Sequence, residues 1–256
     1  MKRQTETAMA AEIKGILFDS GDTLVRPVDG QWFPSPMFHS ILETHGIDGL
    51  DWSKLGQAAR AGGAYLQANH NLSTEDEERD QFQAFHEIAL RELGLAEPSR
   101  ELTRELALAV VDGTNMEPFP DAHASLERLS ARGLRMGILS DTWPSLERKY
   151  REMGLRDYFG PFVISALLGV SKPDERMYRE AIDAMGLPPE NLLFVDNLPE
   201  NVRAAEAHGM QGVVMARGGV ESLTTGDIAD PLNSAPADTD GLLWVTNLAE
   251  LEEVLL

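Results

Sequence analysis

The stretch IKGILFDSGDTL, residues 13–24, passes from a continuous apolar run into polar residues that include two aspartates. An apolar run of this length, followed by turn-forming residues, predicts a β-strand buried on both faces. Asp19 and Asp22 are three residues apart, whereas side chains two apart share one face of an extended chain. Taken alone, an Asp near a Gly is often a turn former, so the role of Asp19 depends on what accompanies it.

Five further apolar runs qualify as strands, and amphipathic stretches separate most of them. The expected strands are residues 13–18, 134–140, 162–165, 191–196, 212–215 and 242–246. The expected helices are residues 121–133, 144–154, 174–186 and 199–210, several of which end at a glycine. Buried strands that alternate with helices predict an α/β fold with a doubly wound parallel sheet, similar to a Rossmann fold.

Residues 36–115 interrupt this alternation, because they show helical periodicity and no convincing strand. We therefore expect a core domain formed by residues 1–35 and 116–256, with a helical cap domain, residues 36–115, inserted after the first strand. Proline restricts both connections, so hinges are expected near Pro34–Pro36 and Glu117–Pro120. Residues 217–241 are rich in Gly, Pro, Asp and Ser, and they predict a long loop.

Composition narrows the possible partners. The chain has 42 acidic and 22 basic residues and a net charge of −20, which disfavours nucleic-acid binding. It has no cysteine, so disulfides, thiolate catalysis and Cys-ligated metals are excluded. No apolar run approaches the roughly 20 residues that span a bilayer, and residues 1–12 lack the apolar segment of a secretory signal. These features predict a cytoplasmic protein without a membrane partner, and they leave the oligomeric state open.

Polar residues with related chemistry follow four of the predicted strands. Asp19 ends the first strand, Ser140 the second, Lys172 follows the third, and the pair Asp196–Asn197 ends the fourth. Ligands of open α/β sheets bind outside the carboxyl ends of the strands, so these side chains are expected to converge. Carboxylate and amide oxygens suit Mg²⁺, and a lysine neutralises phosphate charge. The set therefore favours phosphoryl transfer with Mg²⁺ as cofactor.

Four motifs at these strand ends resemble those of the haloacid dehalogenase (HAD) superfamily hydrolases with a helical cap. They are FDSGDTLV (18–25), GILSDTW (137–143), SKPD (171–174) and FVDNLPEN (194–201). The resemblance covers nearly the whole chain. It implies hydrolysis of a small phosphorylated metabolite, a phosphomonoester, through an aspartyl-phosphate intermediate.

The resemblance also assigns roles to individual residues. Asp19 would be the nucleophile, and Ser140 and Lys172 would hold the transferred group as catalytic and substrate-binding residues. Asp141, next to Ser140, is assigned to substrate binding, although it or Thr142 could cap the helix expected near Pro144. The expected Mg²⁺ ligands are Asp19, the Gly21 carbonyl and Asp196, with Asn197 as a further candidate.

The sequence departs from the family at two of these positions. Gly21 stands where phosphatases of the family usually have a second Asp, which protonates the leaving alcohol, and Asn197 stands where they often have a carboxylate. Glycine keeps the backbone carbonyl for the metal but has no acid. Asp22 is either a turn residue or a displaced acid, and the turn is favoured.

The missing acid also leaves other functions open. A 2-haloacid dehalogenase needs no acid, because halide leaves unprotonated. However, the DxYGT pattern that dehalogenases share around the nucleophile is absent from this chain. A catalytically silent HAD-like binding protein is a third possibility. Trp32, Phe33 and Arg60 are expected to pack within the cap rather than to contact substrate.

Overall fold

The computed structural model describes residues 11–218, 239 and 241–256 of the chain. Its main feature is a six-stranded, entirely parallel sheet in the order β5-β4-β1-β6-β7-β8. The strands are β1 (Gly15–Phe18), β4 (Arg135–Ser140), β5 (Phe162–Ile164), β6 (Leu192–Asp196), β7 (Gln211–Met215) and β8 (Trp244–Val245). Each coincides with one of the six predicted strands, and the predicted fold class is confirmed.

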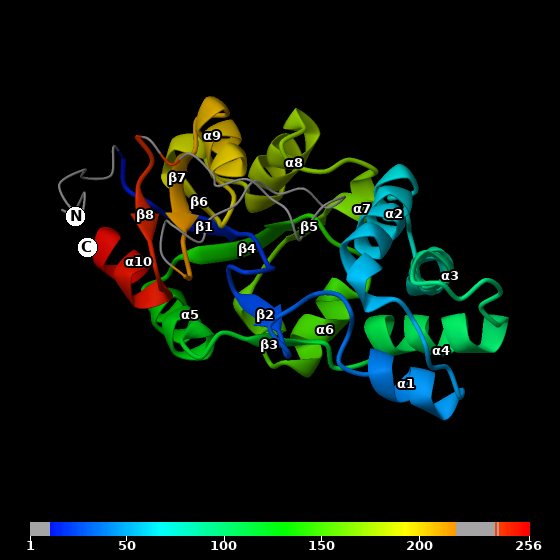
Figure 1. Ribbon diagram of the computed structural model, residues 1–256. Coiled ribbons are helices and arrows are strands. Elements are labelled where there is room, and N and C mark those ends of the chain that lie inside the picture. Colours follow the sequence, from blue (N-terminus) through cyan, green and yellow to red (C-terminus); the bar gives the residue numbers. More distant parts are fainter. Residues whose placement is uncertain (1–10, 219–238, 240) are drawn as a thin grey trace.

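Helices cover both faces of this sheet (Figure 1). On one face lie α5 (Ala122–Ala131), α6 (Leu146–Glu152) and α10 (Leu248–Val254), and on the other lie α8 (Glu175–Met185) and α9 (Pro199–Ala207). Two separate apolar clusters, one for each face, contain alternate residues of β1: Ile16 and Phe18 face one layer, and Leu17 faces the other. The remaining short helices are α7 (Ser165–Leu168), η2 (Arg156–Tyr158) and η3 (Pro189–Asn191).

The inserted cap is helical, as expected. It contains α1 (Phe38–Thr44), η1 (Trp52–Lys54), α2 (Leu55–Ala68), α3 (Glu75–Glu92) and α4 (Arg100–Val111). Thr74 and Glu77 form a capping box that starts α3. A Cβ at Gly62 of α2 would lie 2.5 Å from the ring of Phe85 in α3, so glycine allows these two helices to pack closely. The division of the chain into domains at residues 36 and 115 remains a prediction.

A two-stranded antiparallel ribbon connects the cap to the core, and the sequence did not predict it. It pairs β2 (Val25–Pro27) with β3 (Met116–Pro118). Glu117 and Pro118 are therefore part of a paired strand, and the hinge near Glu117–Pro120 remains a prediction. Three-residue strands containing proline give too short a pattern for recognition from sequence. The predicted loop at 217–241 lies almost entirely outside the described residues.

Helix α6 of the core makes buried polar contacts with the cap. Glu78 of α3 accepts hydrogen bonds from the backbone N–H of Ser145 (2.8 Å) and from its hydroxyl (2.6 Å). Lys149 Nζ donates to the carbonyls of Val110 (3.0 Å) and Gly113 (3.1 Å), at the end of α4. Burial raises the pKa of Glu78 and lowers that of Lys149 to about 8. The cap is thus attached to the core through α6 as well as through its two chain connections.

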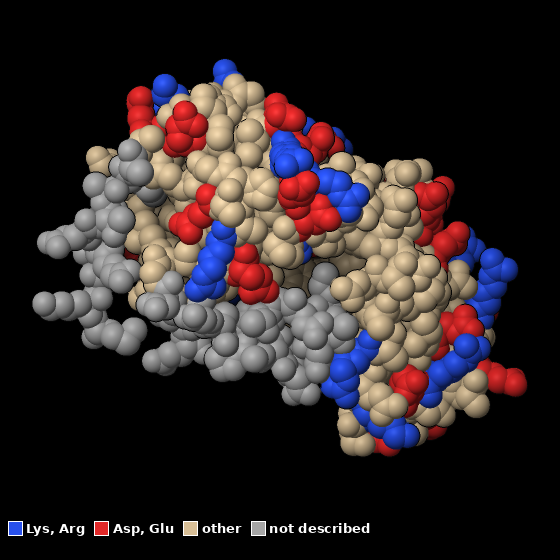
Figure 2. Space-filling view, turned by 90° about the horizontal axis from the view of Figure 1, so that it is seen from above, with Lys and Arg blue, Asp and Glu red and all other residues tan. Residues whose placement is uncertain are grey.

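On the face seen in Figure 2, Lys and Arg side chains of the described residues are interspersed with Asp and Glu. Among the described residues, no helix is both long enough and apolar enough to cross a membrane.

Candidate active site

The register of the central strands brings the predicted motifs together. Phe18, the last residue of β1, is paired with Ile138 of β4 and with Val195 of β6. Asp19 therefore lies level with Leu139 on one side and with Asp196 on the other. A parallel register across three neighbouring strands is what places motifs separated by more than 100 residues at one edge of the sheet.

Lys172 lies at the centre of this edge, on the loop between α7 and α8. Its Nζ donates to Asp19 Oδ1 at 2.7 Å, to Asp196 Oδ2 at 2.6 Å and to the Leu139 carbonyl at 3.1 Å. Its side chain is 1% exposed. Burial lowers the pKa of Lys172, but Asp19 and Asp196 raise it more, so that it lies above the usual lysine value. The ammonium group is therefore charged and links the first and fourth motifs.

Asp19 has one oxygen engaged and one available. Oδ1 accepts the Lys172 hydrogen bond, whereas Oδ2 has no hydrogen-bond partner among the described residues. Burial raises the pKa of Asp19 to about 7, Lys172 opposes this rise, and Asp196 adds to it. A buried carboxylate whose free oxygen lies at the end of the central strand suits nucleophilic attack.

Asp196 is held more firmly than Asp19. Its Oδ1 accepts the N–H of Leu198 at 2.7 Å, and its Oδ2 accepts Lys172 and the Asn201 amide, the latter at 3.1 Å. Asn201 is itself buried, and its carbonyl accepts the Tyr178 hydroxyl at 3.0 Å. The amide of Asn201 therefore orients the carboxylate of Asp196.

Ser140 and Asp141 extend the site along the end of β4. Ser140 is buried at the last position of the strand, and Asp141 Oδ1 accepts the backbone N–H of Lys172 at 2.9 Å. Burial raises the pKa of Asp141 to about 6. The N-cap of α6 is Ser145, so neither Asp141 nor Thr142 caps that helix, contrary to expectation. Instead the carboxylate of Asp141 positions the loop that carries the catalytic lysine candidate.

The turn after Asp19 has an unusual backbone. Asp22 has a φ of 55°, in the left-handed region that glycine normally takes, whereas Gly21 has no such φ. The Ser20 carbonyl accepts the N–H groups of Leu24 and Val25, which closes the turn. Within the described part of the chain, the N–H groups of Ser20 and Gly21 donate no hydrogen bond. Two free backbone donors beside a nucleophile could bind phosphate oxygens.

The residues present fit a hard divalent cation in part. Three buried or half-buried carboxylates, Asp19, Asp141 and Asp196, surround the one ammonium group of Lys172. Burial is the main cause of the raised pKa of Asp19, and the carboxylates of Asp196 and Asp141 add to it. The described residues contain no cluster of three His, Cys, Asp or Glu side chains with metal-binding geometry. Mg²⁺ often binds only one or two protein carboxylates, with water and substrate as the other ligands, so the pair Asp19 and Asp196 is compatible with this cation. Asn197 follows Asp196 and is half-buried.

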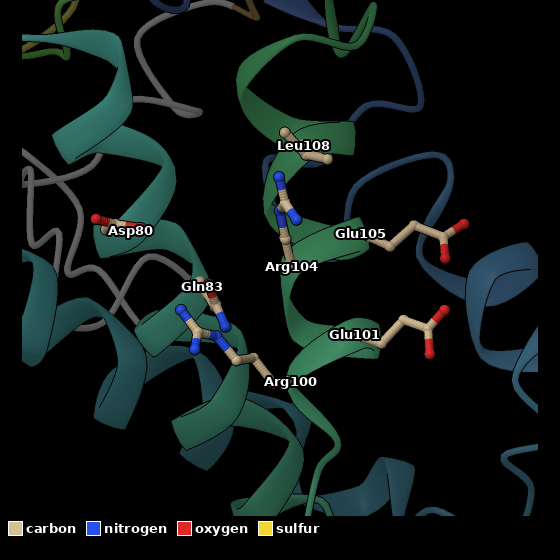
Figure 3. A pocket seen from close by; sticks show the side chains of 7 residues that line it. All are labelled: Asp80, Gln83, Arg100, Glu101, Arg104, Glu105 and Leu108. Carbon is tan, nitrogen blue, oxygen red and sulfur yellow. The ribbon is translucent and has the colours of Figure 1, made fainter.

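A surface cavity of about 840 Å³ lies elsewhere, between α3 and α4 on the cap. In Figure 3, Arg100 extends toward Gln83, while Glu101 and Glu105 point to the opposite side of α4. None of the strand-end residues lines this cavity. The cavity therefore gives no support for a catalytic role, and the buried charges that converge at Lys172 mark the candidate site.

The haloacid dehalogenase-like hydrolase family matches residues 13–209, and the chain belongs to this family. It is a hydrolase with the family's Rossmann-like core and helical cap. It is 37% identical over 138 residues to a phosphoserine phosphatase of Thermus thermophilus, a match that covers 52% of this chain and 55% of that protein. It is 27% identical over 228 residues to a glyceraldehyde 3-phosphate phosphatase of Methanopyrus kandleri, covering 80% of this chain and 85% of the other.

Solved structures share the fold at low identity. The HAD hydrolase YfnB of Bacillus subtilis, in a structure bound to magnesium, superposes with a TM-score of 0.64 at 16% identity and covers 96% of this chain and 99% of its own. A dehalogenase structure with an intermediate complex gives a TM-score of 0.63 at 18% identity, covering 96% of this chain and 98% of its own.

Proposed function

We propose that the protein is a Mg²⁺-dependent phosphatase that hydrolyses a small phosphomonoester through an aspartyl-phosphate intermediate. The observation that carries this proposal is the buried Lys172 ammonium between Asp19 and Asp196, which leaves Asp19 Oδ2 available. The phosphatases among the relatives support it at the level of the reaction class.

In this reaction, side chains and backbone groups of the protein have distinct roles. Asp19 Oδ2 attacks phosphorus in line, and the bond from phosphorus to the leaving oxygen breaks. Lys172, Ser140 and the free N–H groups of Ser20 and Gly21 bind the phosphoryl oxygens and stabilise the charge that develops on them. Water then attacks phosphorus of the acyl phosphate, which releases phosphate and restores the Asp19 carboxylate.

Asp19, the Gly21 carbonyl and Asp196 would hold Mg²⁺, with Asn197 as a further candidate. The cation would supply positive charge against the phosphoryl oxygens. Asp196 is oriented for such a role by the backbone N–H of Leu198 and the side-chain amide of Asn201. The cap would cover the site, exclude bulk water and select the leaving group.

A panel of phosphate esters assayed with Mg²⁺ and with chelator tests this proposal. We expect phosphate release that requires the cation and disappears in Asp19→Asn, which should still fold because the amide preserves the shape of the side chain. Ser130→Ala, a change on the outside of α5, serves as a control and should keep full activity. Full activity in chelator, or retention of activity in Asp19→Asn, would refute the proposal.

A 2-haloacid dehalogenase is the second candidate, because Gly21 supplies no proton donor and halide needs none. The chain is 30% identical over 122 residues to an (S)-2-haloacid dehalogenase of a Pseudomonas species, a match that covers half of that enzyme. Chloride release from 2-chloropropionate without metal, together with no phosphatase activity, would favour this candidate.

A further inference from the structure

Trp32 covers the position from which the family's acid would project. A Cβ built on Gly21 would lie 3.4 Å from Cζ2 of Trp32 and 4.0 Å from its Cη2. The six-membered ring of the indole therefore lies over Gly21, two residues after the nucleophile. In the phosphatases that this chain resembles, the side chain at this position reaches the leaving oxygen. An aromatic surface here occupies the place of a proton donor.

Asp22 fixes the indole in this place. Its Oδ2 accepts the Trp32 Nε1–H at 3.1 Å, and its own N–H donates to the Val25 carbonyl at 2.7 Å. The left-handed φ of 55° at Asp22 costs conformational energy, and such strain persists only where the surroundings enforce it. Because the carboxylate of Asp22 accepts this hydrogen bond, it is directed toward Trp32 rather than toward a leaving group.

The indole is at the same time accessible. Trp32 is 42% exposed, although large aromatic side chains usually bury most of their surface. Phe33, the next residue, packs into the cap against Phe38 and Phe85, as the sequence predicted for both aromatics. Trp32 instead leaves the cap core and contacts the catalytic turn.

We propose that Trp32 is a specificity-determining residue that contacts the leaving group, and that the substrate carries its phosphate on a planar, sp² carbon, as in aryl, enol and acyl phosphates. This inference rests on the proposed function. The oxygen of such a group leaves as a weakly basic anion when its bond to phosphorus breaks, so residue 21 need not supply a proton. A flat ring also offers such a group offset-stacked or edge-to-face contacts.

The test compares two leaving groups of similar size, one planar and one saturated. Phenyl phosphate and cyclohexyl phosphate are assayed for kcat and KM, and phenylphosphonate and cyclohexylphosphonate, which are not hydrolysed, are measured as inhibitors. Trp32→Leu should weaken binding of the phenyl compounds by about fivefold to tenfold, the size of an aromatic contact, and that of the cyclohexyl compounds much less. Trp32→Phe, which keeps a ring, should retain most of the preference.

Trp52→Leu is the matched control, because Trp52 is 40% exposed and lies on the cap against His39. It should leave both inhibition constants unchanged. Asp22→Ala provides a second variant in case Trp32→Leu does not fold, and it should reduce the phenyl preference by releasing the indole. An unchanged phenyl to cyclohexyl ratio in folded Trp32→Leu or Asp22→Ala would overturn the inference while Asp19-dependent hydrolysis persists. If the wild-type protein shows no Asp19-dependent hydrolysis, the proposed function itself is refuted.

Discussion

Exchanging Gly21 and Asp22 should convert the catalytic turn into one that carries an acid. In the double variant Gly21→Asp, Asp22→Gly, glycine takes the left-handed position with φ 55°, and Asp takes a position whose φ it tolerates. The same change removes the carboxylate that holds Trp32, so the indole can move away from the new side chain. Hydrolysis of alkyl phosphates should rise by about 10- to 100-fold, a part of the roughly 10²–10⁴-fold that general acids contribute.

The stability of this variant can be worked out from the structure. Relief of the left-handed Asp should stabilise the protein by about 1 kcal/mol, and loss of the Trp32 hydrogen bond should cost about 1 kcal/mol. Because the composition is unchanged, the effects of glycine on the unfolded chain cancel to first order. The free energy of unfolding should therefore stay within about 1 kcal/mol of the wild type, and urea titration measures it.

Steady-state rates on an aryl and an alkyl phosphate, with Mg²⁺ present, provide the assay. The two single variants are the controls: Asp22→Gly lacks an acid and Gly21→Asp retains the indole close to the new side chain, so neither should match the double variant. A folded double variant that keeps its aryl activity but shows no gain on alkyl esters would refute the reasoning. Loss of only the alkyl reaction in Asp22→Gly would show that Asp22 is the displaced acid.

Three further predictions follow from the buried charges and the cap. Lys172→Met should remove about 2–4 kcal/mol of transition-state stabilisation and so lower kcat/KM for an aryl phosphate. A fall in kcat/KM of less than threefold would contradict the role of the ammonium group. Folding raises the pKa of the buried Glu78, so wild-type stability falls as pH rises from the ordinary glutamate pKa through the raised one. Glu78→Gln should therefore gain stability relative to the wild type as pH rises above the ordinary glutamate pKa of about 4.3, as urea titration at each pH would show. Glu77, whose pKa is lowered by hydrogen bonds from Ser73 and Thr74, provides the control: the stability that its carboxylate contributes is lost as pH falls, so Glu77→Gln should show the opposite trend with pH. Replacing the cap by a short turn that joins β2 to β3 should leave a folded core with reduced substrate selectivity, measured by circular dichroism and the ester panel, whereas an unfolded core would reject the two-part architecture.

The central strands of the sheet were predictable because they are buried on both faces, and continuous apolar runs such as ILF at 16–18 and LLFV at 192–195 are distinctive. The β2–β3 ribbon was not, since three residues containing a proline give no periodic pattern. The candidate residues Asp19 and Asp196 could be named from strand ends, and Lys172 from its place after the third predicted strand. Their geometry depends on register, which comes from the packed sheet and not from any local signal.

The roles of Trp32 and Asp22 show what local sequence cannot supply. The positive φ of Asp22 is set by hydrogen bonds to Val25 and by closure of the turn, and sequence favours glycine for such a conformation. The Trp32 to Asp22 contact spans ten residues across an irregular segment, with no periodicity to indicate which side chains meet. Glu78, which binds Ser145 across 67 residues, was missed for the same reason.

Chemical trapping at Asp19 tests the central claim most directly. The enzyme is mixed with an aryl phosphate and Mg²⁺, quenched during turnover, treated with borohydride and digested, and the peptide containing residue 19 is analysed by mass spectrometry. An aspartyl phosphate is reduced to homoserine, so homoserine at position 19 is expected only when substrate is present, and it should be absent from Asp19→Asn. Turnover without any modification at Asp19, or with the modification on another residue, would contradict the proposed mechanism.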